Sequence, residues 1–407
     1  MRAYRHLSYP PLPQRVARAA VSRCPPTALA YLALLISRAA RSKDEEKYKT
    51  GYVRPAGWTP TAPVKDYKAT RRANPPAALD WQYTEAVTAI KNQGQCGSWC
   101  VLSPPCRLPP TPLSGSALTS MHRAGDPPRG APPRRAPPLA TPPDRRPPLL
   151  AFTRVRSWAF SATEAVESAL VLSTGSQLRL ELSPQQVTSC SPKIGVANPC
   201  LGCNGGTTEG AYDYLTTVTG LTNSFNLPYE QSLTATSKTV ACPTAKIAAI
   251  DGPMMQLTGG YAAVSGYHYA VTPCTSGQCT SQDLAGLQAA LETTPVSVCV
   301  DASSWNDYTG GVMTAAACGG MAASDIDHCV MATGFNTTAP VPYWIVRNSW
   351  SSTWGEYGYI YLEMSENTCG LANDVTIPEV TLDLNDDEKK AAALGRERLY
   401  QKAVLAK

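Results

Sequence analysis

Apolar residues recur at helical spacing in the stretch that begins at position 158. The repeating positions are Trp158, Ala162, Ala165, Val166, Ala169 and Leu170. This spacing gathers the apolar side chains on one face of a helix, and Gly175 suits a C-terminal cap. The pattern therefore predicts a helix over residues 158–175.

The pattern changes to short β-branched and aromatic runs beyond residue 291. These runs predict strands over residues 296–300, 329–333, 343–347 and 357–362. Loops rich in Cys, Gly and Pro are expected between the helix and residue 243. The helical pattern comes first along the chain and the strand patterns follow it, and the two do not alternate. This order predicts an α+β fold.

Both ends of the chain differ from this central pattern. Residues 27–37 form a short apolar run behind three arginines, the layout of a secretory signal, so residues 1–41 are expected to be a leader. A buried helix or a membrane anchor is the alternative. Residues 42–76 have the polar, proline-punctuated composition of a linker or propeptide remnant, and residues 379–407 form a charged tail. Within it, residues 383–407 are either a solvated helix or a frayed end.

A proline-rich insert covers residues 99–156. Of the 36 prolines in the chain, 15 fall between residues 101 and 150. Proline removes a backbone donor and restrains the residue before it, so the insert is expected to be disordered or polyproline-like. Its composition also fits a surface insertion or a linker between domains.

Charge is distributed unevenly along the chain. Residues 1–157 carry 25 Lys and Arg against 8 Asp and Glu, a balance of +17, whereas residues 158–407 carry 11 against 23, a balance of −12. The basic excess is confined to the leader and the insert, and no RNA- or DNA-binding motif accompanies it. No nucleic-acid partner is expected.

The chain has 14 cysteines, a number that points away from the reducing cytosol. Cys200 and Cys203 form a C-x-x-C pair, but a structural zinc site needs a second pair of ligands, and none has suitable spacing. Neither a metal nor a cofactor is expected. Cys299 and Cys329 lie in apolar runs that look like neighbouring strands, where they form either a bridge or two buried thiols.

Two fragments of one catalytic motif flank the insert. Residues 92–98 read N-Q-G-Q-C-G-S, and residues 158–162 read W-A-F-S-A. Joined through one cysteine, they give C-G-S-C-W-A-F-S, which resembles the nucleophile segment of papain-like, cathepsin L-like cysteine peptidases. That cysteine is missing.

The genetic code explains the missing cysteine. Trp99 is encoded TGG and the codon of Cys100 starts with TG, so G and T follow the first two bases of codon 99, as at the start of an intron. If Ser157 is encoded AGC, an intron end, AG, stands before its last base. Removing everything between leaves TG plus C, a cysteine codon. The stretch from Trp99 to Ser157 is therefore interpreted as a translated intron that replaces one nucleophilic cysteine.

Further motifs resemble the same family, in the same order. They are L-S-P-Q-Q at 182–186, G-C-N-G-G at 202–206, I-D-H-C-V at 326–330, W-I-V-R-N-S-W at 344–350 and W-G-E-Y-G-Y at 354–359. The resemblance covers residues 77–98 and 157–378. It implies a helical N-terminal lobe and an antiparallel, barrel-like C-terminal lobe with the active-site cleft between them.

The resemblance also implies roles for individual residues. A cysteine directly before Trp158 lies at a helix N-terminus, where the helix dipole and an imidazolium lower the pKa of a thiol. His328 is its proton-transfer partner and Asn348 orients the ring of His328. Gln93 donates to the oxyanion. Gly205, Gly206 and Trp350 form the substrate-binding part, with Trp350 shielding the bond between His328 and Asn348.

The family pattern pairs six cysteines: Cys96 with Cys203, Cys190 with Cys242, and Cys318 with Cys369. It leaves Cys200, Cys274, Cys279, Cys299 and Cys329 without an assigned partner.

Two departures from the family pattern affect this interpretation. Ser157 occupies the nucleophile position, and because a serine hydroxyl has a far higher pKa than a thiol, the chain as written is expected to be nearly inert. Cys100 is no substitute, because proline-rich chain follows it. The long helical propeptide of the family is not recognisable before residue 76, where cleavage is expected. Asp374 falls where related enzymes line the second specificity pocket, which suggests that basic side chains are accepted.

The sequence therefore predicts a cysteine-type endopeptidase of the secretory pathway, in a lysosome, in a vacuole or outside the cell. The alternative is a non-catalytic homologue that binds peptides or inhibitors. Extended polypeptides are the expected substrates and proteinaceous inhibitors the expected partners, with a monomeric state and no membrane association. His268 is expected in a loop.

Overall fold

The computed structural model describes residues 52–54, 57–94, 157–192, 197–198, 200–230, 239–245, 247 and 262–405. Its helices are α4 (Ser157–Ser173), α5 (Pro184–Cys190), α6 (Thr208–Leu215), α9 (Leu284–Leu291) and α10 (Asp386–Leu405). Its strands are β1 (Ala78–Asp80), β2 (Ala263–Tyr269), β3 (Val296–Val300), β4 (Val312–Met313), β5 (His328–Asn336), β6 (Tyr343–Arg347), β7 (Tyr359–Glu363) and β8 (Val375–Thr381).

One twisted sheet collects the strands, in the order β2-β8-β3-β5-β6-β7-β4. Neighbours are antiparallel, except that the short β4 runs parallel to β7. β5 lies in the middle of the order, and β1 also pairs with it. Because His328 is the first residue of β5, this strand places it beside both β3 and the end of β6.

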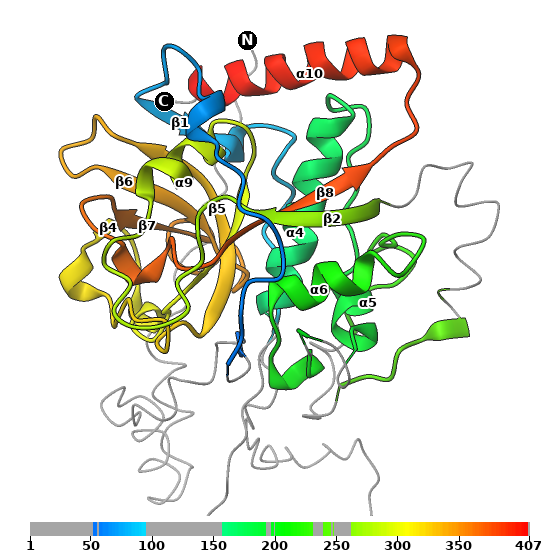
Figure 1. Cartoon of the computed structure of the whole chain (residues 1–407), viewed down its shortest axis with the longest axis horizontal. Helices are drawn as coiled ribbons and strands as arrows, with labels where there is room; N and C mark the ends of the chain where they lie inside the picture. Colours follow the sequence, from blue (N-terminus) through cyan, green and yellow to red (C-terminus); the bar gives the residue numbers. More distant parts are fainter. Residues whose placement is uncertain are drawn as a thin grey trace, which may run out of the picture.

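Two hydrophobic cores lie on either side of α4 (Figure 1). One packs α4, α5 and α6 together around Trp158, Leu170 and Tyr212. The other fills the sheet lobe around Trp305 and Trp344. Segregated helices and strands with two cores make this a two-lobed α+β fold, as the sequence predicts.

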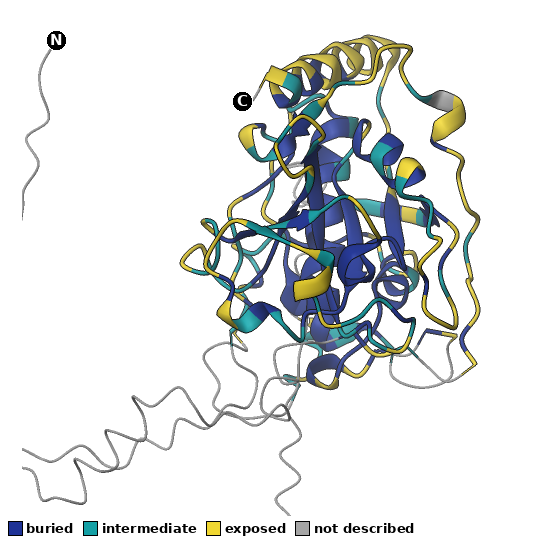
Figure 2. Cartoon of the chain, turned by 90° about the vertical axis from the view of Figure 1, so that its left-hand side faces the viewer, coloured by how far each residue is buried: buried dark blue, intermediate teal, exposed yellow. Residues whose placement is uncertain are grey.

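α4 is buried along almost its whole length. Figure 2 shows that buried residues fill the interior of the molecule. Apolar and small residues surround α4 on all sides, as expected of a helix inside a protein. Each of its two glutamates has a cationic partner. Glu164 lies 3.4 Å from the guanidinium of Arg347, and Glu167 accepts a 3.0 Å hydrogen bond from Lys91. Because Arg347 ends β6 and Lys91 precedes Gln93, these ion pairs tie three active-site segments together.

The predicted helix and strands are present, with small shifts at their ends. α4 begins one residue earlier than expected and β3 has the predicted bounds. The expectation of loops up to residue 243 is wrong, since α5 and α6 lie there. Both are short helices whose N-caps, Ser183 and Thr207, each accept a hydrogen bond from the backbone N–H group three residues on.

The end of the chain is not a free tail. β8 continues to Thr381, past the expected domain end at residue 378, and α10 then packs across the top of the molecule (Figure 1). Its inner face buries Ala392, Leu399 and Ala403. Gly395 meets Gly175 backbone to backbone at the crossing with the end of α4. A side chain on either glycine would collide with the other helix.

Disulfides join Cys190 to Cys242 and Cys318 to Cys369, two of the pairs that the resemblance implies. Cys299 and Cys329 form a bridge between β3 and β5 rather than two buried thiols. Cys274 and Cys279 form a further bridge that the sequence did not indicate. The remaining implied pair cannot be compared, because Cys96 lies outside the described residues, as do residues 1–41 and 99–156.

Within the described residues, no helix combines the length and the apolar character that a membrane crossing requires.

Replacing Gly395 by alanine tests the packing of α10. The added methyl group meets the backbone of Gly175, so we expect the free energy of unfolding to fall by about 1–3 kcal/mol, the usual cost of overpacking. Chemical denaturation measures the change. Ala391→Leu adds more bulk at an exposed position of the same helix and should cost under about 0.5 kcal/mol. Equal losses in the two variants would contradict the close crossing.

Candidate active site

Position 157 is the first residue of α4 and lies directly against β5. Ser157 is fully buried, and its hydroxyl oxygen accepts a 3.1 Å hydrogen bond from the backbone N–H of Cys329. Cys329 follows His328 and is bridged to Cys299, which fixes this end of β5 against β3. A side chain at the start of the helix is therefore held against the backbone of the residue that follows His328, and the helix dipole favours negative charge there.

His328 and Asn348 meet across the sheet, as the sequence predicts. The Nε2 atom of His328 lies 2.9 Å from Oδ1 of Asn348, the residue that follows β6. Oδ1 also accepts from the backbone N–H of Ser349 at 2.8 Å. Since Oδ1 only accepts, Nε2 carries the hydrogen. Within the described part of the chain, no group hydrogen-bonds Nδ1 of His328.

Three tryptophans enclose this pair. Trp350 lies 4.9 Å from His328 between ring centroids, and Trp305 meets the imidazole edge-on at 5.9 Å. Trp354 packs against both of these indoles. Burial lowers the pKa of His328 to about 4, although the hydrogen bond to Asn348 favours the charged ring. With serine at position 157, His328 is therefore a neutral imidazole at physiological pH.

Gln93 joins the same cluster through Ser349. Its backbone N–H donates to the carbonyl of Ser349 at 2.9 Å, and the hydroxyl of Ser349 donates to Oε1 of Gln93 at 2.7 Å. The second bond fixes the rotation of the amide, with the NH₂ group on the side opposite Ser349. Gln93 is buried, so this orientation is held by packing as well.

Gly205 and Gly206 form a backbone edge beside the start of α4. Gly205 has a φ of 101°, which favours glycine, and a Cβ on Gly206 would meet the ring of Trp158 at 2.8 Å. An extended piece of the chain's own N-terminal part lies on this edge. Val53 donates to the carbonyl of Gly206 at 3.0 Å, and Tyr52 donates to the carbonyl of Asp327 at 2.8 Å.

Comparisons with known proteins agree with this geometry. A sequence model of the family described as "Papain family cysteine protease" matches residues 156–379, more than half of the chain. The chain belongs to the papain family of cysteine proteases.

Curated relatives of this papain-family chain include human cathepsin O, 34% identical over 220 residues, which cover 54% of this chain and 58% of cathepsin O. The chain thus spans less than two thirds of that relative. Digestive cysteine proteinase 2 of Homarus americanus is 28% identical to this chain. The alignment covers 79% of this chain and 72% of that proteinase. The structure of procathepsin L2 from Tenebrio molitor larval midgut superposes on this chain with a TM-score of 0.53 at 24% sequence identity. The superposition covers 83% of this chain and 80% of procathepsin L2, and it supports the fold.

Two buried carboxyl groups, Asp374 and Glu209, lie next to this edge around the guanidinium of Arg54, and we call their site the acidic pocket. Asp374 is buried, and its Oδ2 accepts from the hydroxyl of Tyr52 at 2.7 Å and from the guanidinium of Arg54 at 2.9 Å. Glu209 lies close by and accepts from the hydroxyl of Tyr269 at 3.2 Å. Burial, together with the charge of Asp374, raises the pKa of Glu209 to about 8. One guanidinium thus compensates a pair of buried carboxyl groups of which one is protonated at neutral pH.

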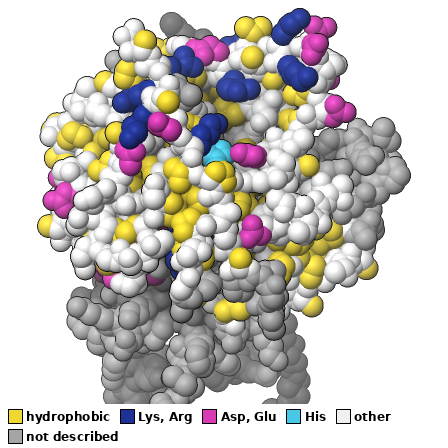
Figure 3. Space-filling view, in the orientation of Figure 1, with side chains coloured by type: hydrophobic (Ala, Val, Ile, Leu, Met, Phe, Trp, Pro, Cys, Tyr) yellow, Lys and Arg dark blue, Asp and Glu magenta, His cyan; other side chains and the backbone are white. Residues whose placement is uncertain are grey.

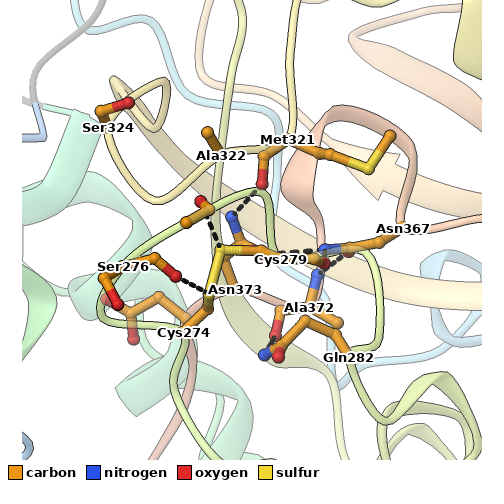
Figure 4. The surroundings of a disulfide bond; sticks show 12 residues. Cys274, Ser276, Cys279, Gln282, Met321, Ala322, Ser324, Asn367, Ala372 and Asn373 are labelled. Carbon is orange, nitrogen blue, oxygen red and sulfur yellow. Dashed lines mark hydrogen bonds between the residues drawn. A yellow bond between two sulfur atoms is a disulfide. The ribbon is translucent and has the colours of Figure 1, made fainter.

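A disulfide-closed loop lies next to Arg54, and Figure 4 shows the surroundings of its disulfide. Arg54 donates to the carbonyl of Cys274 at 2.7 Å, and Cys274 is bridged to Cys279. Asn367 donates to the carbonyl of Cys279 at 2.8 Å, and Cys274 donates to the carbonyl of Asn373 at 2.9 Å. The loop is therefore fastened to the residue that precedes Asp374.

The first cysteine of the C-x-x-C pair lies in the interior of the molecule. Cys200 is buried, and burial raises its pKa to about 12, so its thiol stays protonated. In the described segments, no three His, Cys, Asp or Glu side chains come close enough to hold a metal ion.

Several site residues were not found from the sequence. Glu209, Trp305 and Arg54 lack any local signal, because their positions depend on contacts between distant segments. The expectation that His268 lies in a loop is wrong, since it lies on β2 and is buried between Tyr67 and Glu379.

The protonation of His328 in the chain as written can be measured directly. NMR titration of the imidazole, assigned with His328→Gln, should give a midpoint near pH 4 because the ring is buried without an anionic partner. The unfolded state takes up this proton near pH 6.5, so the contribution to stability should decline as pH falls from about 6.5 to 4. A midpoint at or above 6.5 would contradict the account.

Proposed function

We propose that the gene of this chain encodes a cysteine endopeptidase whose nucleophile occupies position 157 after removal of the insert. The observation that supports this most strongly is the contact of that position with Cys329, directly beside His328, at the start of α4. A thiol there lies in the field of the helix N-terminus and close to an imidazole whose Nδ1 no described group engages. Both conditions favour a thiolate–imidazolium pair.

The proposed reaction uses His328 first as an acid and then as a base. The thiolate attacks the carbonyl carbon of the peptide bond, and the imidazolium of His328 gives its proton to the leaving amine. The acyl-enzyme is then hydrolysed by a water that His328 deprotonates. Asn348 keeps the ring oriented, and the amide NH₂ of Gln93 stabilises the oxyanion, an interaction worth about 3 kcal/mol of barrier.

The chain as written lacks the nucleophile for this reaction. His328 is neutral, with a pKa of about 4, and a serine hydroxyl does not ionise near neutral pH. No charge pair forms, so we expect the unspliced polypeptide to be nearly inert.

The second candidate function is a non-catalytic, peptide-binding homologue with a genuine serine. It is favoured by the good fit of Ser157, which is buried and hydrogen-bonded to Cys329 without any clash. Both candidates share the extended-peptide edge at Gly206, and they differ in whether a thiol at position 157 is present and reactive.

Arg54 and Asp374 support a preference for basic substrate side chains. The segment that lies on Gly206 inserts Arg54 into the buried acidic pocket, where its guanidinium bonds Asp374. A substrate arginine or lysine can take the same place once that segment has left. We also propose a secretory-pathway compartment, supported by the four disulfides among the described residues, and extended polypeptides and proteinaceous inhibitors as ligands of a monomer.

A thiol-reactive active-site probe tests the proposed nucleophile. We expect rapid labelling of the protein in which a single cysteine replaces residues 99–157, and loss of labelling when His328→Ala is added, because the imidazole maintains the thiolate. Mass spectrometry locates the label.

The matched control carries the same deletion with serine in place of the restored cysteine, and it should remain unlabelled because the active-site probe needs a thiolate at position 157. Peptidase activity that is equal in the cysteine and serine forms would sink the proposal.

Substrates that differ only in the side chain for the acidic pocket test the preference for basic residues. In the unlabelled, cysteine-containing form, Asp374→Asn should lower the ratio of kcat/KM for arginine over leucine substrates at least tenfold, about 1.4 kcal/mol. Asp307→Asn, at an exposed acid, should leave the ratio unchanged.

The pH dependence isolates Glu209. Burial and the charge of Asp374 raise the pKa of Glu209 well above that of an ordinary carboxyl group. The preference for arginine should therefore increase as pH rises above neutrality and Glu209 ionises, and Glu209→Gln should abolish that increase. If the ratio of kcat/KM for arginine over leucine substrates does not change with pH in the protein without Glu209→Gln, this part of the proposal is wrong.

A further inference from the structure

The end of β5 carries a sequence signal that the candidate active site does not use. Residues 336–338 read N-T-T, an acceptor triplet for N-linked glycosylation, in which any residue except proline separates an asparagine from a serine or threonine. Asn336 is the only asparagine of the chain that is followed two positions later by serine or threonine. Because such short triplets also arise by chance, the place of Asn336 in the fold carries the argument.

The triplet lies at a hairpin turn on the surface. Asn336 is the last residue of β5 and pairs with Tyr343, the first residue of β6. We call residues 337–342 the acceptor turn; they are exposed apart from the half-buried Ala339. Figure 1 shows this turn at the left-hand edge of the molecule, and the same edge of the space-filling view in Figure 3 carries few charged side chains. A bulky sugar on Asn336 can therefore extend into solvent.

The side chain of Asn336 is held with its amide nitrogen available. Its Oδ1 accepts from the backbone N–H and from the hydroxyl of Thr338, both at 3.0 Å, and from the backbone N–H of Ala339 at 3.1 Å. These bonds fix the rotation of the amide, and none of the described residues hydrogen-bonds Nδ2. A sugar on Nδ2 therefore displaces no hydrogen bond of the described fold.

The middle residue of the triplet anchors the turn. The backbone N–H and the hydroxyl of Thr337 both donate to the carbonyl of Ala77, at 2.8 and 2.7 Å. Ala78 in β1 pairs with Asn336 itself. Contacts with two neighbouring strands, β1 and β6, thus hold the acceptor at a fixed place on the surface.

The acceptor lies far from the candidate active site. His328 and Asn336 are the two ends of β5, a strand of nine residues. At about 3.3 Å per residue, the strand separates them by about 25 Å. A sugar on Asn336 is therefore compatible with an open cleft.

We propose that Asn336 is an N-glycosylation site that is modified as the chain enters the secretory pathway. The donor is an oligosaccharide on a lipid diphosphate, and a membrane-bound transferase catalyses the transfer. Nδ2 forms a bond to the anomeric carbon of the sugar and gives one proton to a base of the transferase. The bond from that carbon to the diphosphate breaks, and the lipid diphosphate leaves with the electron pair. The proposal rests on the proposed secretory-pathway compartment and is independent of the residue at position 157.

Cell-free translation of the full chain with rough microsomes tests the acceptor. We expect one discrete increase in apparent mass that a peptide-N-glycosidase reverses, with mass spectrometry locating the resulting aspartate at position 336. Asn336→Gln and Thr338→Ala should abolish the increase, whereas Thr338→Ser should retain it because serine keeps the hydroxyl. The control Asn74→Gln removes an exposed asparagine that proline follows, and it should behave as the parent.

A second chain, in which an established signal peptide replaces residues 1–41, separates the two ways in which the proposal can fail. Phe225→Thr gives either chain a second triplet, at Asn223, and reports that the chain has crossed the membrane; the side chain that it replaces is 94% exposed. If Asn336 stays unmodified in the chain with the added signal peptide, the acceptor is wrong. If modification requires that signal peptide, the acceptor stands and the secretory compartment is wrong.

Discussion

The contact between the first residue of α4 and the first residues of β5 is the constraint on which the site depends. It brings a side chain at a helix N-terminus within one residue of His328, and the bridge between Cys299 and Cys329 holds β5 at that place. The ion pairs of Glu164 and Glu167 then align the strand that leads to Asn348 and the segment that leads to Gln93 with the same helix. One buried helix thus positions every member of the candidate site.

Burial has two consequences at this site. It excludes water from the bond between His328 and Asn348, and it holds the imidazole neutral as long as no anion stands beside it. The same physical rule governs the acidic pocket, where Glu209 stays protonated next to Asp374. Burial therefore disfavours the charged form of both His328 and Glu209. A neighbouring group of opposite charge shifts these protonation states strongly. Arg54 is the oppositely charged group beside Asp374 and Glu209, and a thiolate at position 157 would be the oppositely charged group for His328.

Local sequence patterns predicted the features that local physics determines. The bounds of β3, the helix after position 158 and the segments around His328 and Asn348 follow from periodicity and motif. The patterns failed where distant segments meet. The short α5 and α6 carry too few residues for a clear period, and the burial of α10 depends on the meeting of Gly395 with Gly175. Nothing near Arg54 indicated that it pairs with a residue more than 300 positions away.

The central claim is that position 157 belongs to a cysteine that the interrupted reading frame conceals. Sequencing mature transcripts across codons 90–165 tests it most directly. The account predicts that codons 99–157 are replaced by one TGC codon between Ser98 and Trp158. Retention of the proline-rich spacer in every mature transcript would contradict it, because the start of α4 would then carry a hydroxyl that His328 cannot ionise.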